Sequence, residues 1–483
     1  MKTKSKILFL VTIAVLFSAC ENFLVEQPRL SQSYELTLSN YTGLNNATGG
    51  AYSQLCSTGW YGAGLVITAD MKGGNAKRGS VVSGRYVDEY LWNNRPTATS
   101  GLWSVAYSTI AKANNVMEVI DGGFTEVNIT QAQLDALKGE CLFLRALGYF
   151  DLARMYCQPY SSGTDNLGVP VVLVTENGYP ARNTVGETYD QVVTDLLAAI
   201  PLLPATSLRG TDAAFATKVA AQALLAKVYL YMENWQQAAN YATTVIGTTG
   251  LSLFTPEEYT TWAPDGDGYW GSGGAGAEII FQVDGSEANS SHGSWEAISY
   301  MMDPTGYGDC AASMDVVSLY EAGDVRKDLF LQPSEYPGEY WSLKYPGRLG
   351  MIPHKEYNTP VLRLAEMYLI RAEALLHSAT ITDVTALDDF NAIRTNRGLA
   401  AAASVDLTEI YKERRRELCF EGNELFDLAR TQRSLSRTDF TGLLNKDIAF
   451  TAGGSAITNY LWAMPIPQSE CDANVNMEQN PGY

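Results

Sequence analysis

Aromatic side chains gather in two stretches of this chain that lack regular periodicity. Residues 251–359 carry Tyr259, Trp262, Tyr269, Trp270, Trp295, Tyr300 and Tyr307, and the earlier stretch carries Trp60, Tyr61 and Trp92. A sugar ring presents flat patches of C–H bonds and edges of hydroxyls, so rigid aromatic faces flanked by planar polar groups recognise it well. The two stretches therefore predict a carbohydrate-binding surface. For any one ring, the alternative is an ordinary place in the core.

Motifs for catalysis or metal binding are weak in the same loops. Gly271, Gly273 and Gly276 spell G-x-G-x-x-G, but strand-like residues follow where a dinucleotide fold requires a helix. Asp265 and Asp267 begin like a calcium loop, yet aromatic residues occupy later ligand positions. We therefore expect no catalytic residue, no cofactor and no bound metal. A glycoside hydrolase stays open as an alternative, because two suitably spaced carboxylates suffice and several acids lie in these loops.

Helical periodicity dominates the rest of the chain. It predicts helices near residues 38–55, 103–120, 130–157, 188–204, 361–376 and 386–397, and two helices within 217–250 that hinge at Asn234 and Trp235. Small residues such as Ala238 and Ala242 let paired helices approach closely, as in a tetratricopeptide (TPR) unit. The expected fold is mainly α, with TPR-like helical hairpins in an α-α superhelical scaffold. The insertion at 251–359 is expected to be rich in loops, with a few short strands such as 278–283.

The stretch 412–431, KERRRELCFEGNELFDLART, mixes a dense run of charge with apolar residues. It predicts a helix over 407–421, a tight turn at Gly422 and a second helix that begins near Asn423. Arg and Glu within a packed helix pair usually form structural ion pairs, with their alkyl stems against neighbours. We interpret Glu413, Glu417 and Glu421 in this way rather than as catalytic acids.

The net charge and the N-terminal segment limit the class of protein to which this chain can belong. The 483 residues carry a formal net charge of −19, which disfavours nucleic acid and anionic lipid headgroups as partners. Residues 1–19 have a basic start and an apolar stretch of about 16 Å as a helix, too short for a bilayer core of roughly 30 Å. They predict a signal peptide. Cys20 follows as in a bacterial lipobox and is the expected lipid attachment site, with an ordinary secretory signal as the alternative.

Three stretches resemble the SusD/RagB family of surface nutrient-binding lipoproteins. They are residues 412–431, the run VLRLAEMYLIRAEALL at 361–376, and PIPQSECDANVNMEQNPGY at 465–483. Asn423 and Glu424 stand where the family usually carries a basic or His pair, and Thr431 stands where an aromatic residue is frequent. The resemblance implies a lipid-anchored protein at the outer membrane, exposed at the cell surface. It implies capture of an oligosaccharide or polysaccharide without catalysis, and delivery to a SusC-like TonB-dependent transporter.

The same resemblance implies site residues and a division of the chain. The family site contains an acid, an arginine and polar or aromatic partners. By position in the sequence, the resemblance assigns these roles to Asp70, Arg78, Trp92 and Asn94. The expected glycan contacts are completed by Trp60, Tyr61, Tyr269, Trp270, Trp295 and Tyr300. The expected division is a signal peptide at 1–19, an N-terminal TPR-containing half at 20–250 and a C-terminal half at 251–483. Besides a glycosidase, a peptide-binding receptor and a pure assembly subunit remain as alternatives, the last favoured if Trp92, Trp270 and Trp295 are all buried.

Overall fold

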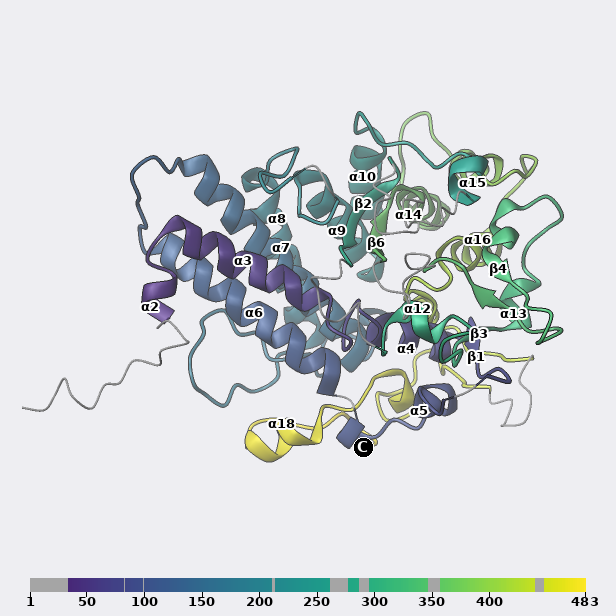
Figure 1. Ribbon diagram of the computed structural model, residues 1–483, viewed down its shortest axis with the longest axis horizontal. Helices are drawn as coiled ribbons and strands as arrows, with labels where there is room; N and C mark the ends of the chain where they lie inside the picture. Colours follow the sequence, from purple (N-terminus) through teal and green to yellow (C-terminus); the bar gives the residue numbers. More distant parts are fainter. Residues whose placement is uncertain are drawn as a thin grey trace, which may run out of the picture.

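The computed structural model describes residues 34–81, 83–98, 100–210, 213–260, 277–285, 295–345, 357–438 and 447–483. Long helices lie side by side at one end of the molecule, and shorter helices, strands and loops make up the other end (Figure 1). None of the helices in these ranges is both long and apolar enough to cross a bilayer. The predicted helical scaffold is confirmed.

Four long helices form the N-terminal layer. They are α3 (Tyr41–Leu55), α6 (Ser100–Asp121), α7 (Gln131–Tyr156) and α8 (Val185–Leu202), preceded by the short α2 (Tyr34–Thr37). The helix expected from residue 38 begins at 41 because the side chain of Asn40 accepts a hydrogen bond from the Gly43 N–H and caps it. Thr130 and Thr184 form capping boxes that fix the starts of α7 and α8.

Two helical hairpins follow the TPR-like pattern. The first pairs α9 (Lys218–Tyr231) with α10 (Trp235–Ile246), and Asn234 caps α10 at the predicted hinge. The second pairs α14 (Leu364–His377) with α15 (Ala386–Asn396), and α10 packs against α14. Ala238 and Ala242 are fully buried between the helices, as their small size predicts.

The strands in the described ranges are short and form three antiparallel pairs. The predicted strand at 278–283 is confirmed as β2 (Ile279–Val283), which pairs antiparallel with β6 (Thr359–Arg363). The helix expected from residue 361 was therefore placed too early, because residues 361–363 belong to β6. Two further antiparallel pairs join β1 (Ala76–Lys77) to β3 (Ala311–Ala312) and β4 (Phe330–Leu331) to β5 (Trp341–Ser342).

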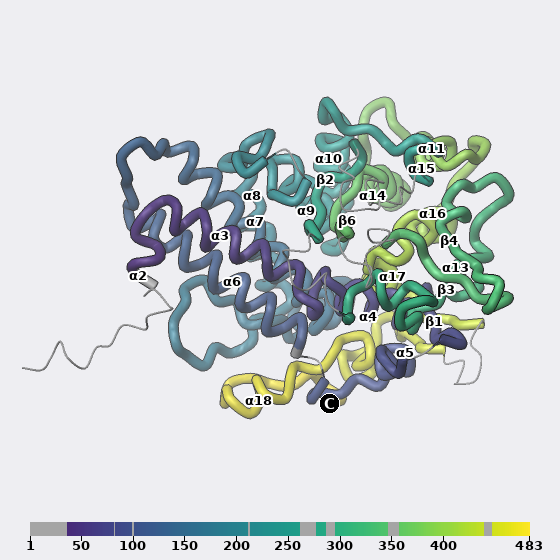
Figure 2. Tube along the Cα trace, in the orientation of Figure 1, coloured from purple at the N-terminus to yellow at the C-terminus, as the bar shows by residue number. Residues whose placement is uncertain are grey.

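Short helices connect these elements. The α-helices are α4 (Gly64–Gly73), α5 (Val87–Leu91), α11 (Pro256–Thr260), α12 (Ile298–Met301), α13 (Met314–Val317), α16 (Leu407–Leu418), α17 (Glu424–Arg430) and α18 (Gln468–Ala473). The 3-10 helices are η1 (Pro96–Ala98), η2 (Tyr160–Ser162), η3 (Val325–Leu329) and η4 (Tyr460–Trp462). In the tube view α17 lies beside α4, although about 350 residues separate them in the sequence (Figure 2).

The turn between α16 and α17 differs from the prediction. The first helix ends at Leu418 rather than near residue 421, because Cys419 leaves helical geometry with φ −58° and ψ 143°. Phe420 and Gly422 then take the left-handed conformation, with φ of +62° and +73°. This conformation is unfavourable for a bulky residue such as Phe420, so the surrounding structure must hold it.

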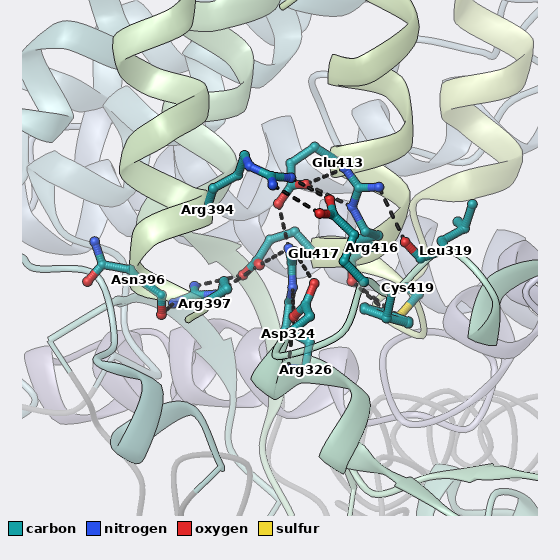
Figure 3. A network of polar contacts seen from close by, with 12 residues as sticks. Leu319, Asp324, Arg326, Arg394, Asn396, Arg397, Glu413, Arg416, Glu417 and Cys419 are labelled. Atoms are coloured by element: carbon teal, nitrogen blue, oxygen red, sulfur yellow. Dashed lines mark hydrogen bonds and ion pairs between the residues drawn. The ribbon is translucent and has the colours of Figure 1, made fainter. Parts of the chain in front are cut away.

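Glu413, Arg416 and Glu417 of α16 belong to a buried ion-pair network, as predicted (Figure 3). Glu417 accepts hydrogen bonds from Arg326, Arg363 and Arg397 at 2.8–3.0 Å. Glu413 accepts from Arg326 at 2.6 Å and Arg416 at 2.8 Å. All of these side chains are buried, so the network joins α16 to η3, to β6 and to Arg397, which follows α15, from within.

One hydrophobic cluster runs through both halves of the chain. It includes Leu44 and Leu55 of α3, Phe143 of α7, and Phe426 of α17. The ring of Phe143 contacts that of Phe281 on β2, with centroids 4.9 Å apart. The two halves therefore share a core. The expected division of the chain near residue 250 stays a prediction.

Candidate functional site

Three aromatic rings form a cluster that reaches the surface beside α12. Trp295 is 52% exposed, and the rings of Tyr300 and Tyr307 are partly buried behind it. Edge-on contacts join Trp295 to Tyr300 at 5.1 Å and Tyr300 to Tyr307 at 4.7 Å between centroids. We call these three residues the aromatic cluster. Their mutual contacts hold the rings rigid, so stacking of a ligand costs little conformational entropy.

A tight turn after α12 brings the two tyrosines together. The carboxylate of Asp303 accepts hydrogen bonds from the N–H and hydroxyl of Thr305, and the Tyr307 N–H donates to the carbonyl of Tyr300. Gly306 packs so closely on Tyr300 that a Cβ would lie 2.6 Å from its carbonyl oxygen. Glycine is therefore required for the turn, and the turn sets the positions of both rings.

An arginine and a glutamate border the aromatic cluster. The guanidinium of Arg85 lies 3.8 Å from the ring centroid of Tyr307 and donates to both carboxylate oxygens of Glu296 at 2.6–2.9 Å. The hydrogen bonds that Arg85 donates to Glu296 raise the pKa of Arg85. Both side chains keep partial exposure, at 30% and 46%. The pair offers a ligand one fixed donor group and one fixed acceptor group beside the rings.

A buried acid supports this arginine. The carboxylate of Asp309 accepts hydrogen bonds from the backbone N–H groups of Ser83 and Gly84, at 2.8 and 3.1 Å, and from the Ser83 hydroxyl. Arg85 in turn donates to the same hydroxyl at 2.8 Å. Asp309 thus anchors the loop that carries Arg85 onto the segment that carries the tyrosines.

Four residues expected to contact a glycan lie in the interior, which corrects those predictions. The first two are Trp60 and Tyr61, which donate to the Asp151 carboxylate of α7 at 2.6 and 2.7 Å. The ring of Trp60 is fully buried and Tyr61 is nearly so. Their stretch is a loop, as predicted, but it folds inward, so these rings stabilise the scaffold and cannot stack on a ligand.

Asp70 is the third buried residue. The expected loop at this position is the end of α4, and the Asp70 carboxylate is completely inaccessible. It accepts hydrogen bonds from the backbone N–H groups of Phe420 and Gly422 and from Asn75. Burial raises the pKa of Asp70 to about 6, although these hydrogen bonds oppose the rise. Its role is to hold the turn between α16 and α17.

Trp92 is the fourth, at 2% exposure. Its ring contacts Trp462 edge-on at 4.9 Å, and the Lys72 ammonium lies 3.9 Å from its centroid. The neighbouring Asn94 is only partly buried, but its side chain accepts from Lys72 and donates to the Leu461 carbonyl and the Tyr483 hydroxyl. These two residues tie the segment after α5 to the C-terminal end of the chain.

Comparisons with known proteins agree with this fold. Residues 22–230 match the family described as "Starch-binding associating with outer membrane", and residues 336–483 match the "SusD family". The chain belongs to the SusD/RagB family. A SusD-like protein of Bacteroides ovatus is 26% identical, over 88% of this chain and 82% of its own length. The starch-binding protein SusD of Bacteroides thetaiotaomicron is 30% identical over 139 residues, which span 27% of this chain and 23% of its own.

Solved structures of the family share the architecture. The crystal structure of a SusD superfamily protein from Bacteroides vulgatus superposes with a TM-score of 0.80 at 29% sequence identity. The superposition covers 92% of this chain and 99% of that one.

In this SusD/RagB chain, the remaining predicted contacts besides Asn94, Trp295 and Tyr300 are Arg78, Tyr269 and Trp270. Arg78 is half-buried at the start of the loop that leads from β1 to Arg85. Tyr269 and Trp270 lie outside the described residues, as do the candidate calcium loop and Cys20. A role for Arg78, Tyr269 and Trp270 in ligand contact therefore stays a prediction.

Sequence reasoning missed Arg85 and left Tyr307 out of the expected contacts. Both lie in the stretches that it had singled out. Arg85 follows Arg78 by seven residues, and Tyr307 follows Tyr300 by seven. What the sequence lacked was the pairing of Arg85 with Glu296, across 211 positions. Only the contact between the two loops distinguishes Arg85 from its neighbours.

Proposed function

We propose that this chain binds glycans at the aromatic cluster and delivers them to a SusC-like TonB-dependent transporter, without catalysis. The observation that carries the proposal is the exposed Trp295 ring, braced by Tyr300 and Tyr307 and bordered by the Arg85–Glu296 pair. A sugar needs one flat apolar face and a few oriented polar groups, and this site offers both. Family membership and the starch-binding relative support the same ligand class.

Two acids beside the rings support binding rather than hydrolysis. A glycosidase requires one carboxyl that gives up a proton and a second carboxylate that acts as base or nucleophile. Here Glu296 is held by the Arg85 guanidinium, and Asp309 is buried and held by the Ser83–Gly84 backbone. Both carboxylates already accept hydrogen bonds from protein donors, which suits a positioning role.

The charges around the rings favour a neutral glycan. Among the described residues, the carboxylates of Glu296, Asp309 and Asp303 lie around the rings, and the guanidinium of Arg85 is the cation that contacts them. The whole chain carries −19. A uronate-rich or sulfated polysaccharide would therefore approach an unfavourable field, whereas a neutral glucan would not.

The anchor and the transporter belong to the same proposal. Cys20 would carry the lipid after removal of residues 1–19, and two or more acyl chains would hold the protein stably at the outer membrane. The helical scaffold would present the bound glycan to the transporter. Mass spectrometry of the mature protein tests the anchor: an acylated N-terminal Cys20 is expected, and an unmodified N-terminus elsewhere contradicts it.

Calorimetry with a panel of oligosaccharides tests the ligand class. We expect binding to at least one neutral glycan with an affinity in the micromolar to millimolar range, which is common for shallow sites. The matched assay for new reducing ends should stay blank with every glycan. A gain of reducing ends would establish the glycosidase alternative.

A pool of peptides in the same calorimeter tests the second alternative. Heat from peptides and none from glycans would identify a peptide receptor. The assembly-subunit alternative was favoured if Trp92, Trp270 and Trp295 were all buried, and the 52% exposure of Trp295 counts against it.

A further inference from the structure

A second pocket lies between α16 and the residues that follow α17. Its volume is ≈ 390 Å³, enough for a single monosaccharide-sized molecule. One wall is the outer face of α16, where Thr408, Tyr411, Lys412 and Arg415 recur at helical spacing. Glu424 and Leu428 of α17 line it from the other helix, and residues 433–436 complete it. We call this the α16 pocket; no residue of the aromatic cluster lines it.

A buried acid, Glu424, lines the α16 pocket. Glu424 is 5% exposed, and its carboxylate accepts no hydrogen bond from the described part of the chain. The nearest cation is Arg415, whose Nε lies 3.9 Å from Glu424 Oε1. Arg415 is already engaged, because it donates to the side chain of Asn75 and the carbonyl of Gly74. Buried carboxylates are normally satisfied, so the geometry leaves Glu424 available to a ligand.

An arginine with unused donors lines the same pocket. The guanidinium of Arg433 stacks 4.2 Å from the ring centroid of Tyr411, and its Nε donates to the Thr431 hydroxyl at 2.7 Å. Its two terminal nitrogens donate to no group among the described residues. A planar pair of N–H donors held by stacking matches the two oxygens of a carboxylate.

The charges of the lining residues favour an anion. Lys412, Arg415 and Arg433 contribute three positive charges and Glu424 at most one negative charge. This stands out in a protein of net charge −19. Lys412 also pairs with the exposed Glu409 at 2.6 Å, which reduces but does not remove the excess. The aliphatic side chains of Leu319 and Leu428 add an apolar surface.

We propose that the α16 pocket binds a small carboxylate that bears a neighbouring hydroxyl, as in a monomeric sugar acid. The ligand carboxylate pairs with the terminal nitrogens of Arg433, and its hydroxyl donates to the Glu424 carboxyl. The carbon skeleton of the ring packs against the leucines. This site is separate from the proposed glycan surface. The charges around Trp295 favour neutral ligands at that surface.

Glu424 makes this binding sensitive to pH. Burial raises its pKa to about 7, while Arg415 and Arg433 oppose the rise and Asp427 and Asp70 add to it. Below this pH the carboxyl is neutral and no longer repels the ligand carboxylate, and its carbonyl oxygen still accepts the hydroxyl proton. Affinity should therefore increase as pH falls from 8 to 6, by about threefold or more.

Titration of the purified protein with D-glucuronate, followed by calorimetry or saturation-transfer NMR, tests the proposal. D-Glucose lacks the carboxylate, and acetate lacks the hydroxyls. We expect a dissociation constant for glucuronate in the millimolar range and affinities at least about tenfold weaker for the other two. Equal binding of acetate, equal binding of glucose by the Trp295→Ala variant, which lacks the proposed glycan surface, or no binding of glucuronate would overturn the proposal.

Three variants assign the binding to this pocket. Arg433→Gln removes the partner of the carboxylate and should weaken glucuronate binding about tenfold or more. Glu424→Gln should keep the affinity measured at pH 6 and abolish its dependence on pH, an effect that a purely structural role would not produce. Trp295→Ala should leave glucuronate binding unchanged, because the aromatic cluster is a different site. A loss in Trp295→Ala, or a normal affinity in Arg433→Gln, contradicts the assignment; circular dichroism confirms that each variant is folded.

Discussion

The carboxylate of Asp70 accepts a hydrogen bond from the backbone N–H of Phe420 at 2.8 Å, across 350 positions of sequence. Phe420 is held in the left-handed conformation, and the Gly422 N–H donates to the same carboxylate at 3.1 Å. The end of α4 therefore fixes the turn that separates the ion-pair helix α16 from α17. An acid expected at a ligand surface instead stabilises the most distinctive stretch of the chain.

The variant Asp70→Asn tests this relationship. The NH2 group of the new asparagine would face a backbone N–H, and two donors cannot form a hydrogen bond. A hydrogen bond is therefore lost inside the core, and the free energy of unfolding should fall by about 1–3 kcal/mol. Denaturation in urea measures the change. Asp165→Asn, at an exposed loop residue, is the matched control and should unfold like the wild type. If the variant kept full stability but lost glycan affinity, the buried role assigned to Asp70 would be wrong.

Glu417→Gln tests the buried network. The charge of Glu417 compensates three arginines, Arg326, Arg363 and Arg397, so its removal leaves positive charge unpaired in the core. We expect a loss of about 3–5 kcal/mol in the free energy of unfolding. Glu409→Gln on the same helix removes an exposed partner of Lys412 and should change it by less than about 0.5 kcal/mol. Similar effects of the two substitutions would show that the network contributes little.

Stability should pass through a maximum in mildly acidic solution. Burial alone would raise the pKa of Glu417, but Arg397 and Arg363 hold it well below its usual value of 4.5. Its contribution is therefore present above pH 4.5 and lost as pH falls. Asp70 behaves in the opposite way: its pKa is raised from 3.8 to about 6, so its contribution is present at low pH and lost as pH rises through 6.

Melting temperatures recorded from pH 3 to 9 should thus be highest near about pH 4.5, the usual pKa of Glu417, and should decline from there to about pH 6 as the contribution of Asp70 is lost. In Glu417→Gln the fall on the acid side should be less steep, whereas in Asp70→Asn the decline between about pH 4.5 and 6 should be shallower. A curve that rises steadily to pH 8 would contradict this balance.

Trp295→Ala tests the glycan surface. Removal of the exposed ring deletes the face on which a sugar stacks, and a central aromatic contact of this kind contributes roughly 2 kcal/mol, which is about thirtyfold in affinity. Calorimetry with the best glycan of the panel gives the change. Tyr179→Ala removes another exposed aromatic ring, 64% accessible and outside the aromatic cluster, and should bind as the wild type does. Unchanged affinity in Trp295→Ala would exclude this surface.

Trp92→Phe distinguishes a structural role of Trp92 from contact with a ligand. The smaller ring should weaken the contacts with Trp462 and Lys72 and lower the free energy of unfolding by about 1–3 kcal/mol. Because Trp92 is buried, the affinity of the folded fraction for a glycan should not change. A selective loss of affinity at normal stability would instead place Trp92 in contact with the ligand.

The local pattern of the sequence determined the positions of several helices and the nature of the charged stretch in α16. The spacing of apolar residues located α6, α7, α9 and α10, since amphipathic helices carry their own period. The alternation of Arg and Glu in α16 indicated structural ion pairs, and the aromatic loops indicated where a sugar surface would form. Trp295 and Tyr300 of the aromatic cluster were singled out in this way, because the sequence displays their residue types directly; their contact with a glycan stays a prediction.

Tertiary structure alone decided which rings reach the surface. Trp60, Trp92 and Trp295 all occur in irregular segments, and nothing in their neighbours distinguishes them. Burial depends on which distant group each segment meets, Asp151 for Trp60 and Trp462 for Trp92. The partnerships of Asp70 with Phe420 and of Arg85 with Glu296 likewise join positions hundreds of residues apart. Such contacts arise from packing of the whole chain, and no local period records them.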